Sequence, residues 1–153
     1  MKIILLLSTL MLASAIALPV LAGETDLPFE KLPAKVQKTM KRLVGPDKIT
    51  KTTKETEKDG RILYEVAYRD GEKKFEAEVS PEGELLVVDE ELTLATTPAG
   101  VRKAIKEVTA GGKIGKIEKA TKGKEVYYEA EFKKGGDDHE VKVAPNGKII
   151  STE

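Results

Sequence analysis

The sequence predicts an α+β protein built from two tandem units, each with one helix followed by four antiparallel strands. Three observations lead to this prediction: a Pro-Ala helix start occurs twice, segments with a period of two follow each start, and glycine-containing turns separate those segments. The units occupy residues 33–92 and 93–153. We expect both helices to pack on one face, and the units to share a core or one continuous sheet.

The N-terminal segment, residues 1–22, has the composition of a cleavable signal peptide: a lysine at the second position, then a nearly uninterrupted apolar stretch. Small and apolar residues before Gly23 predict cleavage between Ala22 and Gly23, with an earlier cut after Ala17 as the weaker alternative. A retained membrane anchor is the alternative, because the stretch approaches the ~20 residues that span a bilayer; Pro19 favours cleavage. The mature chain, with residues 23–32 as a lead-in, is therefore predicted to be periplasmic or secreted.

Pro33 and Pro98 open two helices of matching pattern. Proline is favoured at the first helical position, because its φ is already helical and no backbone donor is needed there. Apolar residues then recur at i, i+4 and i+7, which gives each helix one apolar stripe. These residues are Val36, Met40 and Leu43 in the first helix and Val101, Ile105 and Val108 in the second. Thr97 is predicted to be the N-cap of the second helix.

Two strands in each unit alternate apolar and polar residues, which predicts one buried face per strand. The alternating residues are Ile62, Tyr64, Val66 and Tyr68, then Phe75, Ala77 and Val79; their counterparts are Val126, Tyr128, Ala130 and Phe132, then His139, Val141 and Val143. The spacing between copies falls from 65 residues in the helices to 64 in these strands. One hairpin of the second unit should therefore be one residue shorter.

The first and last strand of each unit have weaker patterns. The first strands, residues 48–57 and 113–121, are polar, and the last strands cover residues 84–88 and 148–151. Residues 89–96 form a short, partly apolar linker that we expect to extend the preceding strand. A unit of about 60 residues is only marginally stable alone, since it buries roughly 60% of its unfolded surface. We therefore expect little independent motion of the units.

These motifs resemble those of the PepSY-like exported proteins, in a two-copy group related in fold to beta-lactamase inhibitory protein. The matching residues are Leu32, Pro33, Val36, Ile49, Tyr64, Glu65, Pro81 and Gly83, then Pro98, Val101, Ile114, Tyr128, Glu129, Pro145 and Gly147. The resemblance implies a helix-plus-sheet module outside the cytoplasm, whose relatives bind or restrain peptidases and other hydrolases. It carries over the fold and not the partner. The inhibitory relative uses an aromatic-rich concave sheet, whereas this chain has no tryptophan and is expected to place its tyrosines on the apolar face.

Composition and charge exclude several classes of function. The 26 basic and 26 acidic residues balance, which gives no electrostatic case for binding nucleic acid or, after leader cleavage, a membrane. The absence of cysteine excludes disulfides and thiolate metal sites. No cofactor-binding motif occurs. The chain is not predicted to be an enzyme.

Candidate catalytic and metal-binding residues are few. His139 is the only histidine, and alternation should turn it toward the apolar side while Asp138 and Glu140 point away, so metal ligands would diverge. Neither serine of the mature chain lies in a glycine-flanked nucleophile elbow. Carboxylate pairs such as Glu76 with Glu78 should lie on an outward face with ordinary pKa values. No catalytic or metal residue is assigned.

Lysines recur from the first strand of the second unit into its first turn: Lys113, Lys116, Lys119, Lys122 and Lys124. A charged edge strand that discourages aggregation is the favoured interpretation. A modest preference for anions or acidic peptides is the alternative.

The face away from the helices is the predicted partner-contact face. Its proposed contact residues are Glu65, Arg69, Lys74, Glu76, Glu129, Glu131, Lys133, Glu140 and Lys142. Such a mixed-charge surface suits cross-strand pairing and salt-sensitive contact with another protein. The leading hypothesis is a monomeric protein-binding module that contacts another extracytoplasmic protein. The alternative is a sensor for a small ligand or ion that uses the lysine-rich strand or residues 137–140.

Overall fold

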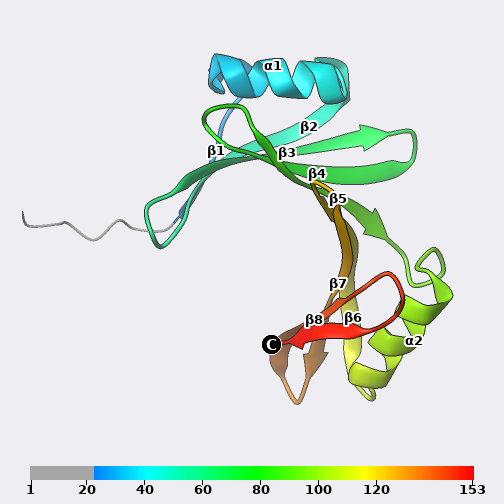
Figure 1. The fold of residues 1–153 in the computed structure, drawn as a ribbon. Helices are drawn as coiled ribbons and strands as arrows, with labels where there is room; N and C mark the ends of the chain where they lie inside the picture. The colour runs from blue at the N-terminus through cyan, green and yellow to red at the C-terminus, as the bar shows by residue number, and fades with distance from the viewer. Residues whose placement is uncertain (1–22) are drawn as a thin grey trace, which may run out of the picture.

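The computed structural model describes residues 23–153 and shows one antiparallel sheet of nine strands with two helices (Figure 1). Strand order in the sheet follows chain order from β1 to β9, so each strand pairs with the next one along the chain. The sheet curves, both helices lie on its convex side, and no described helix covers the concave side. The predicted signal peptide, residues 1–22, lies outside the described residues.

The elements follow the predicted order, with one addition at the start. The first half contains β1 (Gly23–Asp26), a 3-10 turn (Phe29–Lys31), α1 (Ala34–Leu43), a second 3-10 turn (Pro46–Lys48), β2 (Ile49–Thr56), β3 (Ile62–Asp70), β4 (Lys73–Val79) and β5 (Leu85–Leu92). The second half contains α2 (Ala99–Val108), β6 (Lys113–Lys122), β7 (Glu125–Lys134), β8 (Asp137–Val143) and β9 (Ile149–Thr152). Neither described helix is long and apolar enough to cross a membrane.

Strand β1 corrects the prediction that residues 23–32 are only a lead-in. It pairs with β2, with Asp26 opposite Thr53. The pairing is reinforced beyond the strand, because Leu27 N donates to Thr52 O at 3.0 Å and the Thr52 hydroxyl donates to Leu27 O. Lys51 adds an ion pair to Asp26 at 3.1 Å. The four residues of β1 show no alternation of apolar and polar side chains, so no sequence pattern predicts a strand here. The strand is recognised in the structure from its pairing with β2.

The two helices begin one residue later than predicted. Pro33 and Pro98 have ψ near 141° and 143°, which is extended backbone, so each proline precedes the first helical residue. Thr97 is not the predicted N-cap: its hydroxyl donates to Thr93 O at 2.8 Å. The hydroxyl therefore belongs to the turn that precedes α2 and does not cap the helix.

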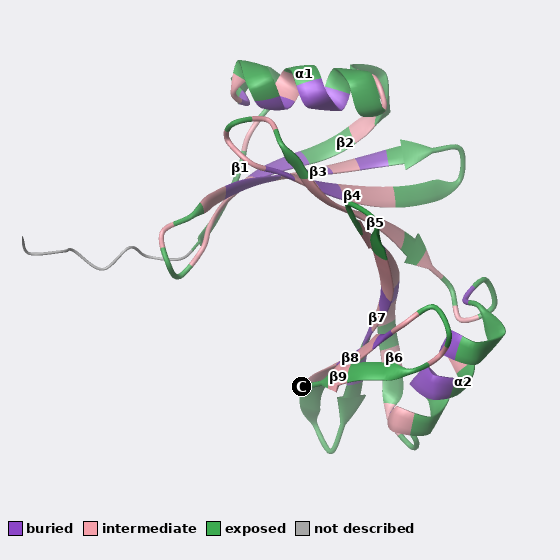
Figure 2. Cartoon of the chain, in the orientation of Figure 1, coloured by how far each residue is buried: buried purple, intermediate pink, exposed green. Residues whose placement is uncertain are grey.

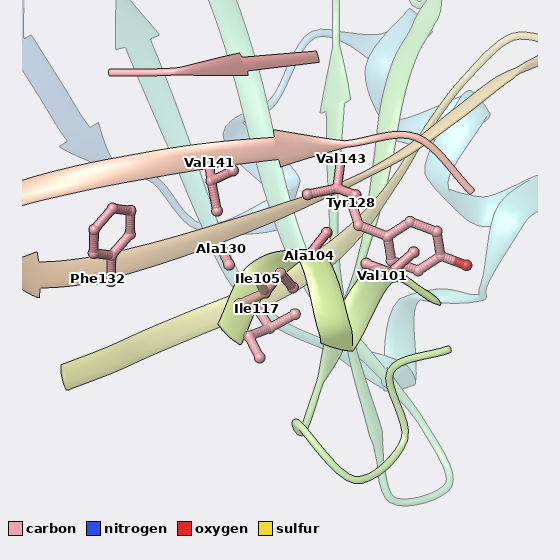
Figure 3. Close-up of a cluster of buried hydrophobic side chains, with 9 residues drawn as sticks. All are labelled: Val101, Ala104, Ile105, Ile117, Tyr128, Ala130, Phe132, Val141 and Val143. Atoms are coloured by element: carbon pink, nitrogen blue, oxygen red, sulfur yellow. The ribbon is translucent and has the colours of Figure 1, made fainter. Parts of the chain in front are cut away.

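Each helix covers its own apolar cluster, and the two clusters share no residue. Val36 and Met40 of α1 pack with Tyr64, Val66 and their neighbours on β3 and β4. The second cluster contains Val101, Ala104, Ile105, Ile117, Tyr128, Ala130, Phe132, Val141 and Val143 (Figure 3). The buried side of each helix faces the sheet, and the outer side is exposed (Figure 2). Of the two expected links between the units, the continuous sheet is present and the shared core is not.

The turns explain the change of spacing and hold the helices on the sheet. Thr56 pairs with Ile62 across the β2–β3 turn with five residues between them, whereas the equivalent pair across the β6–β7 turn, Thr121 with Val126, has four. Gly83, with φ of +84°, lies so close to α1 that a Cβ atom would be 2.8 Å from Lys35 O. The Thr39 hydroxyl donates to Gly83 O at 2.6 Å.

Strand β6 is not the predicted edge strand. It lies between β5 and β7, because β5 continues through the expected linker to Leu92 and pairs with β6 over Val88 to Leu92. The lysines of this segment do not form one surface. Lys116 belongs to the concave side, while Lys119 lies opposite the core residue Tyr128 on the convex side.

Candidate functional site: the concave face of the sheet

The concave face consists of the side chains that alternate along the strands with the core residues of the convex side. All nine residues of the predicted contact face belong to it by strand register. On the first half, Arg69 lies opposite Lys74 and Glu65 opposite Glu78. The other predicted residues follow the same alternation: Glu76 on β4, and Glu129, Glu131, Lys133, Glu140 and Lys142 on β7 and β8.

Three predicted residues, Arg69, Lys74 and Glu76, line a hollow of about 180 Å³ on the first half of this face. The lining also includes Thr50, Ala67, Tyr68 and Phe75 of β2–β4, and Glu91, Lys116 and Glu118 of β5 and β6. Lys74 Nζ lies 2.8 Å from a carboxylate oxygen of Glu91. The hollow thus contains both charge signs and joins strands from the two halves of the chain.

Lys116 holds together strands that are not neighbours. Its Nζ lies 2.7 Å from Glu76 on β4 and 2.8 Å from Glu118 on β6, so the side chain crosses over β5. Burial alone would lower the pKa of Lys116, but the hydrogen bonds to Glu118 and Glu76 outweigh it and raise the pKa. Burial raises the pKa of Glu118 more than Lys116 lowers it. The lysine is therefore a fixed cation among carboxyl groups.

On the second half, ion pairs also fix the predicted residues. Lys142 Nζ lies 2.7 Å from Glu129 and 4.5 Å from the ring centre of Tyr127. Lys133 pairs with Asp138 at 2.9 Å. Tyr127 corrects the expectation that the tyrosines lie on the apolar side: the other three do, but Tyr127 precedes Tyr128 on β7 and alternation turns it to the concave face.

Carboxylates lie directly opposite one another across this face. The pairs are Glu24 with Glu55, Glu65 with Glu78, Glu76 with Asp89, Glu91 with Glu118, Glu118 with Glu129, and Glu131 with Glu140. Among the paired residues of the described sheet, no two carboxylates are opposite one another on the convex side. Directly opposed like charges destabilise a sheet. In the free protein, this repulsion between opposed carboxylates occurs on the concave face only.

Asp89 lies near the middle of the concave face. Within residues 23–153, its Oδ1 is the one buried side-chain oxygen or nitrogen without a hydrogen-bond partner. Burial, followed by the nearby charge of Glu118, raises the pKa of Asp89 to about 7. Burial likewise raises the pKa of Glu65 and of Glu78. The expectation of ordinary carboxyl pKa values on this face is therefore wrong for Glu78.

His139 occupies the place that the sequence predicts for it, on the convex side. Its ring stacks on Phe132 with centroids 5.2 Å apart, as Phe75 stacks on Tyr68 at 5.1 Å in the first half. Nδ1 lies 3.2 Å from Glu153 O. No group of three or more histidine or carboxylate side chains in the described part of the chain could hold a metal ion.

Several solved structures have this architecture. A protein of Bacteroides eggerthii, described as a candidate periplasmic protein, superposes with a TM-score of 0.67 and 14% identity over 79% of this chain and 87% of its own. A DUF2874 family protein of Bacteroides ovatus gives 0.65 and 15% over 79% and 86%. A BLIP-like protein of Bacteroides fragilis gives 0.62 and 14% over 78% and 83%.

The fold is BLIP-like. No family model matches the sequence, and no curated protein does. The resemblance to the PepSY-like proteins therefore stays a prediction, while the likeness to the BLIP-like structure concerns the fold.

Within this BLIP-like fold, sequence reasoning missed the centre of the concave face. The expected extension of the preceding strand through Asp89 and Glu91 is present, but the sequence assigned this extension neither a face nor a partner strand. Lys116 and Glu118 fall in the strand placed at an edge. The sequence does contain a pattern that could have placed this segment: Val88 and Leu92 are apolar and have the spacing of residues on one face of a strand, here the convex side. That alternation would have turned Asp89 toward the open face.

Proposed function

We propose that this chain is a non-enzymatic protein-binding module that acts outside the cytoplasm and docks its concave face onto another protein. The observation that carries the proposal is the contrast between the two faces. The convex face is covered by helices, while the concave face is open and presents charged side chains held by ion pairs such as Lys116–Glu76 and Lys142–Glu129. Side chains fixed before contact lose less entropy on binding.

The burial of several small and apolar residues on the concave face also supports this proposal. Ala120 is fully buried, and Leu63 and Thr53 are nearly so, although no described helix covers them. The long charged side chains around them lie across the sheet and shield these smaller residues. A partner with a protruding loop or ridge fits such a surface better than a flat one.

The sequence and the comparisons together support the proposed location and the proposed class of partner. The signal-peptide composition of residues 1–22 supports export, and the Bacteroides eggerthii structure of the same fold is described as a candidate periplasmic protein. In its narrower form, the proposal is that the partner is a peptidase or another hydrolase that this chain regulates or inhibits. The resemblance to exported PepSY-like proteins and the BLIP-like fold support this form.

Site-specific photo-crosslinking in cells of the source organism tests the docking face. The crosslinking amino acid p-benzoylphenylalanine replaces Tyr127 or Glu131 on the concave face, or Lys38 on the outer side of α1 as a matched control. We expect the two concave positions to yield the same covalent adduct with one other protein, and Lys38 to yield none. Adducts that are equal at all three positions, or absent from both concave positions, would contradict the proposal.

The narrower form has its own measurement. If the crosslinked protein is a hydrolase, the purified mature chain should lower its turnover in proportion to occupancy. Unchanged turnover at saturation would reject inhibition and leave the docking result standing.

A further inference from the structure

We propose that the partner presents clustered lysine or arginine side chains to the concave face, and that these cations contact Glu65, Glu78 and Asp89. This inference rests on the proposed function and adds the chemistry of the partner. Its basis is the arrangement of carboxylates across the sheet, together with the distribution of charge between the two faces.

The opposed carboxylates are only partly neutralised within the chain. Lys116 binds Glu76 and Glu118, and Lys142 binds Glu129. Among the described residues, no ion pair within 4.0 Å reaches Glu65, Glu78 or Asp89. Glu65 and Glu78 are directly opposite one another, and Asp89 is directly opposite Glu76. A cation placed over these positions would remove a repulsion that the free protein bears.

Asp89 also has an acceptor that no described residue satisfies. Its Oδ1 is buried without a hydrogen-bond partner, which is costly for a polar atom. The charged groups around it come from several strands: Glu76 and Glu78 on β4, Lys116 and Glu118 on β6, and Glu129 on β7. Carboxylates dominate this set, so a donor that arrives from a partner is favoured when it carries positive charge.

The charge on the other face strengthens the complementarity. Helix α1 carries Lys35, Lys38, Lys41 and Arg42 and no acidic residue. The directly opposed carboxylates of the described sheet lie on the concave face, whereas these four cations belong to a helix on the convex side. Such a dipolar molecule would orient a basic partner toward the concave face during approach.

A hexa-arginine peptide is a suitable probe, with hexa-glutamate as the counter-probe. We expect the mature chain to bind hexa-arginine at pH 8 and about 0.1 M salt, with amide chemical-shift changes confined to β3–β7. The double variant Glu78→Gln/Asp89→Asn should weaken binding at least tenfold. The matched control, Glu72→Gln/Glu82→Gln, removes the same charge from two exposed turns and should change the dissociation constant less than twofold.

Binding should also depend on pH, because Asp89 attracts a cation only when ionised. Affinity for hexa-arginine should rise between pH 5.5 and pH 8 in the native chain, and this rise should shrink in Asp89→Asn. Far-UV circular dichroism and a thermal melt of each variant establish that it is folded.

Three results would overturn the inference: no binding of hexa-arginine, equal weakening in both double variants, or equal binding of hexa-glutamate. Each leaves the crosslinking result intact, since crosslinking at Tyr127 does not depend on the partner's charge. A second copy of this chain could also supply cations through α1. Sedimentation that shows concentration-dependent self-association, lost in Glu78→Gln/Asp89→Asn, would replace the proposed partner with that second copy.

Discussion

At the scale of single residues, Asp89 links the stability of the protein to pH. Its pKa is about 7 in the folded chain, against an ordinary value of 3.8. A raised carboxyl pKa means that the folded state holds a proton that the unfolded state has released between these two values. The free energy of unfolding therefore falls as pH rises from about 4 to about 7 and is constant above that range with respect to this group.

Asp89→Asn should make the protein more stable at pH 8, by on the order of 1–2 kcal/mol once solvent screening of a half-buried group is allowed for. It should change stability little at pH 4. Urea unfolding at several pH values measures this, with Asp137→Asn at the exposed start of β8 as a control. A variant whose stability falls with pH as steeply as that of the native chain would contradict the role given to Asp89.

The local sequence pattern predicts the position of some residues of the concave face and not of others. Period-two alternation on β3, β4, β7 and β8 was enough to place all nine predicted residues on one face, because apolar partners such as Val66 and Val141 fix the orientation of each strand. The centre of the face could not be placed in this way. Asp89 and Lys116 are brought together only by the pairing of β5 with β6, which joins segments whose local patterns are weak.

At the scale of secondary-structure elements, the Pro-x-Gly turn is a docking point for a helix. Gly83 combines φ of +84° with a position where an added Cβ atom would be 2.8 Å from Lys35 O of α1. Gly71, in the β3–β4 turn, has φ of +62° and nothing within 4 Å of an added Cβ. The two glycines share a conformation and differ in their surroundings.

Gly71→Ala should lower the free energy of unfolding by about 1 kcal/mol, because only the left-handed backbone conformation disfavours alanine at this position. Gly83→Ala should cost about 3 kcal/mol or more, because the backbone of α1 must also move. Thermal or urea unfolding of the two variants gives the comparison. Equal losses would show that the contact with α1 adds nothing to the requirement for glycine.

The helices and most strands could be predicted from sequence, because each has an apolar stripe or alternation of its own. Strand β1 and the interior position of β6 could not. The four residues Gly23–Asp26 depend on hydrogen bonds from β2, and the position of β6 depends on which strand the extended part of β5 pairs with. Long-range pairing decides both features.

At the scale of the whole molecule, Lys116 is the charged link between the two halves. The halves have separate apolar clusters, so the β5–β6 pairing and the ion pair between Lys116 and Glu76 carry the connection, while Glu118 holds Lys116 within its own strand. Lys116 is about one-third exposed, which places its contribution between those of buried and surface ion pairs.

Lys116→Met should lower the free energy of unfolding by about 1–2 kcal/mol at pH 8, since it leaves two carboxylates without their cation. Lys74→Met, at an exposed ion pair with Glu91, is the matched control and should cost less than about 1 kcal/mol. Native-state hydrogen exchange should show lower protection of β3 and β7 amides together. A loss confined to one half would mean that the halves unfold independently.

The chain-order pairing of all nine strands has a consequence for how the protein is made. Contact order is low for a β-rich fold, because every strand finds its partner in the next segment to be released. A chain that emerges from an export channel with its N-terminus first can complete α1 and its apolar cluster before α2 appears. Each later strand then pairs with the strand formed just before it, so an unpaired strand edge is covered as soon as the next segment emerges. Little apolar surface is therefore exposed to aggregation during folding.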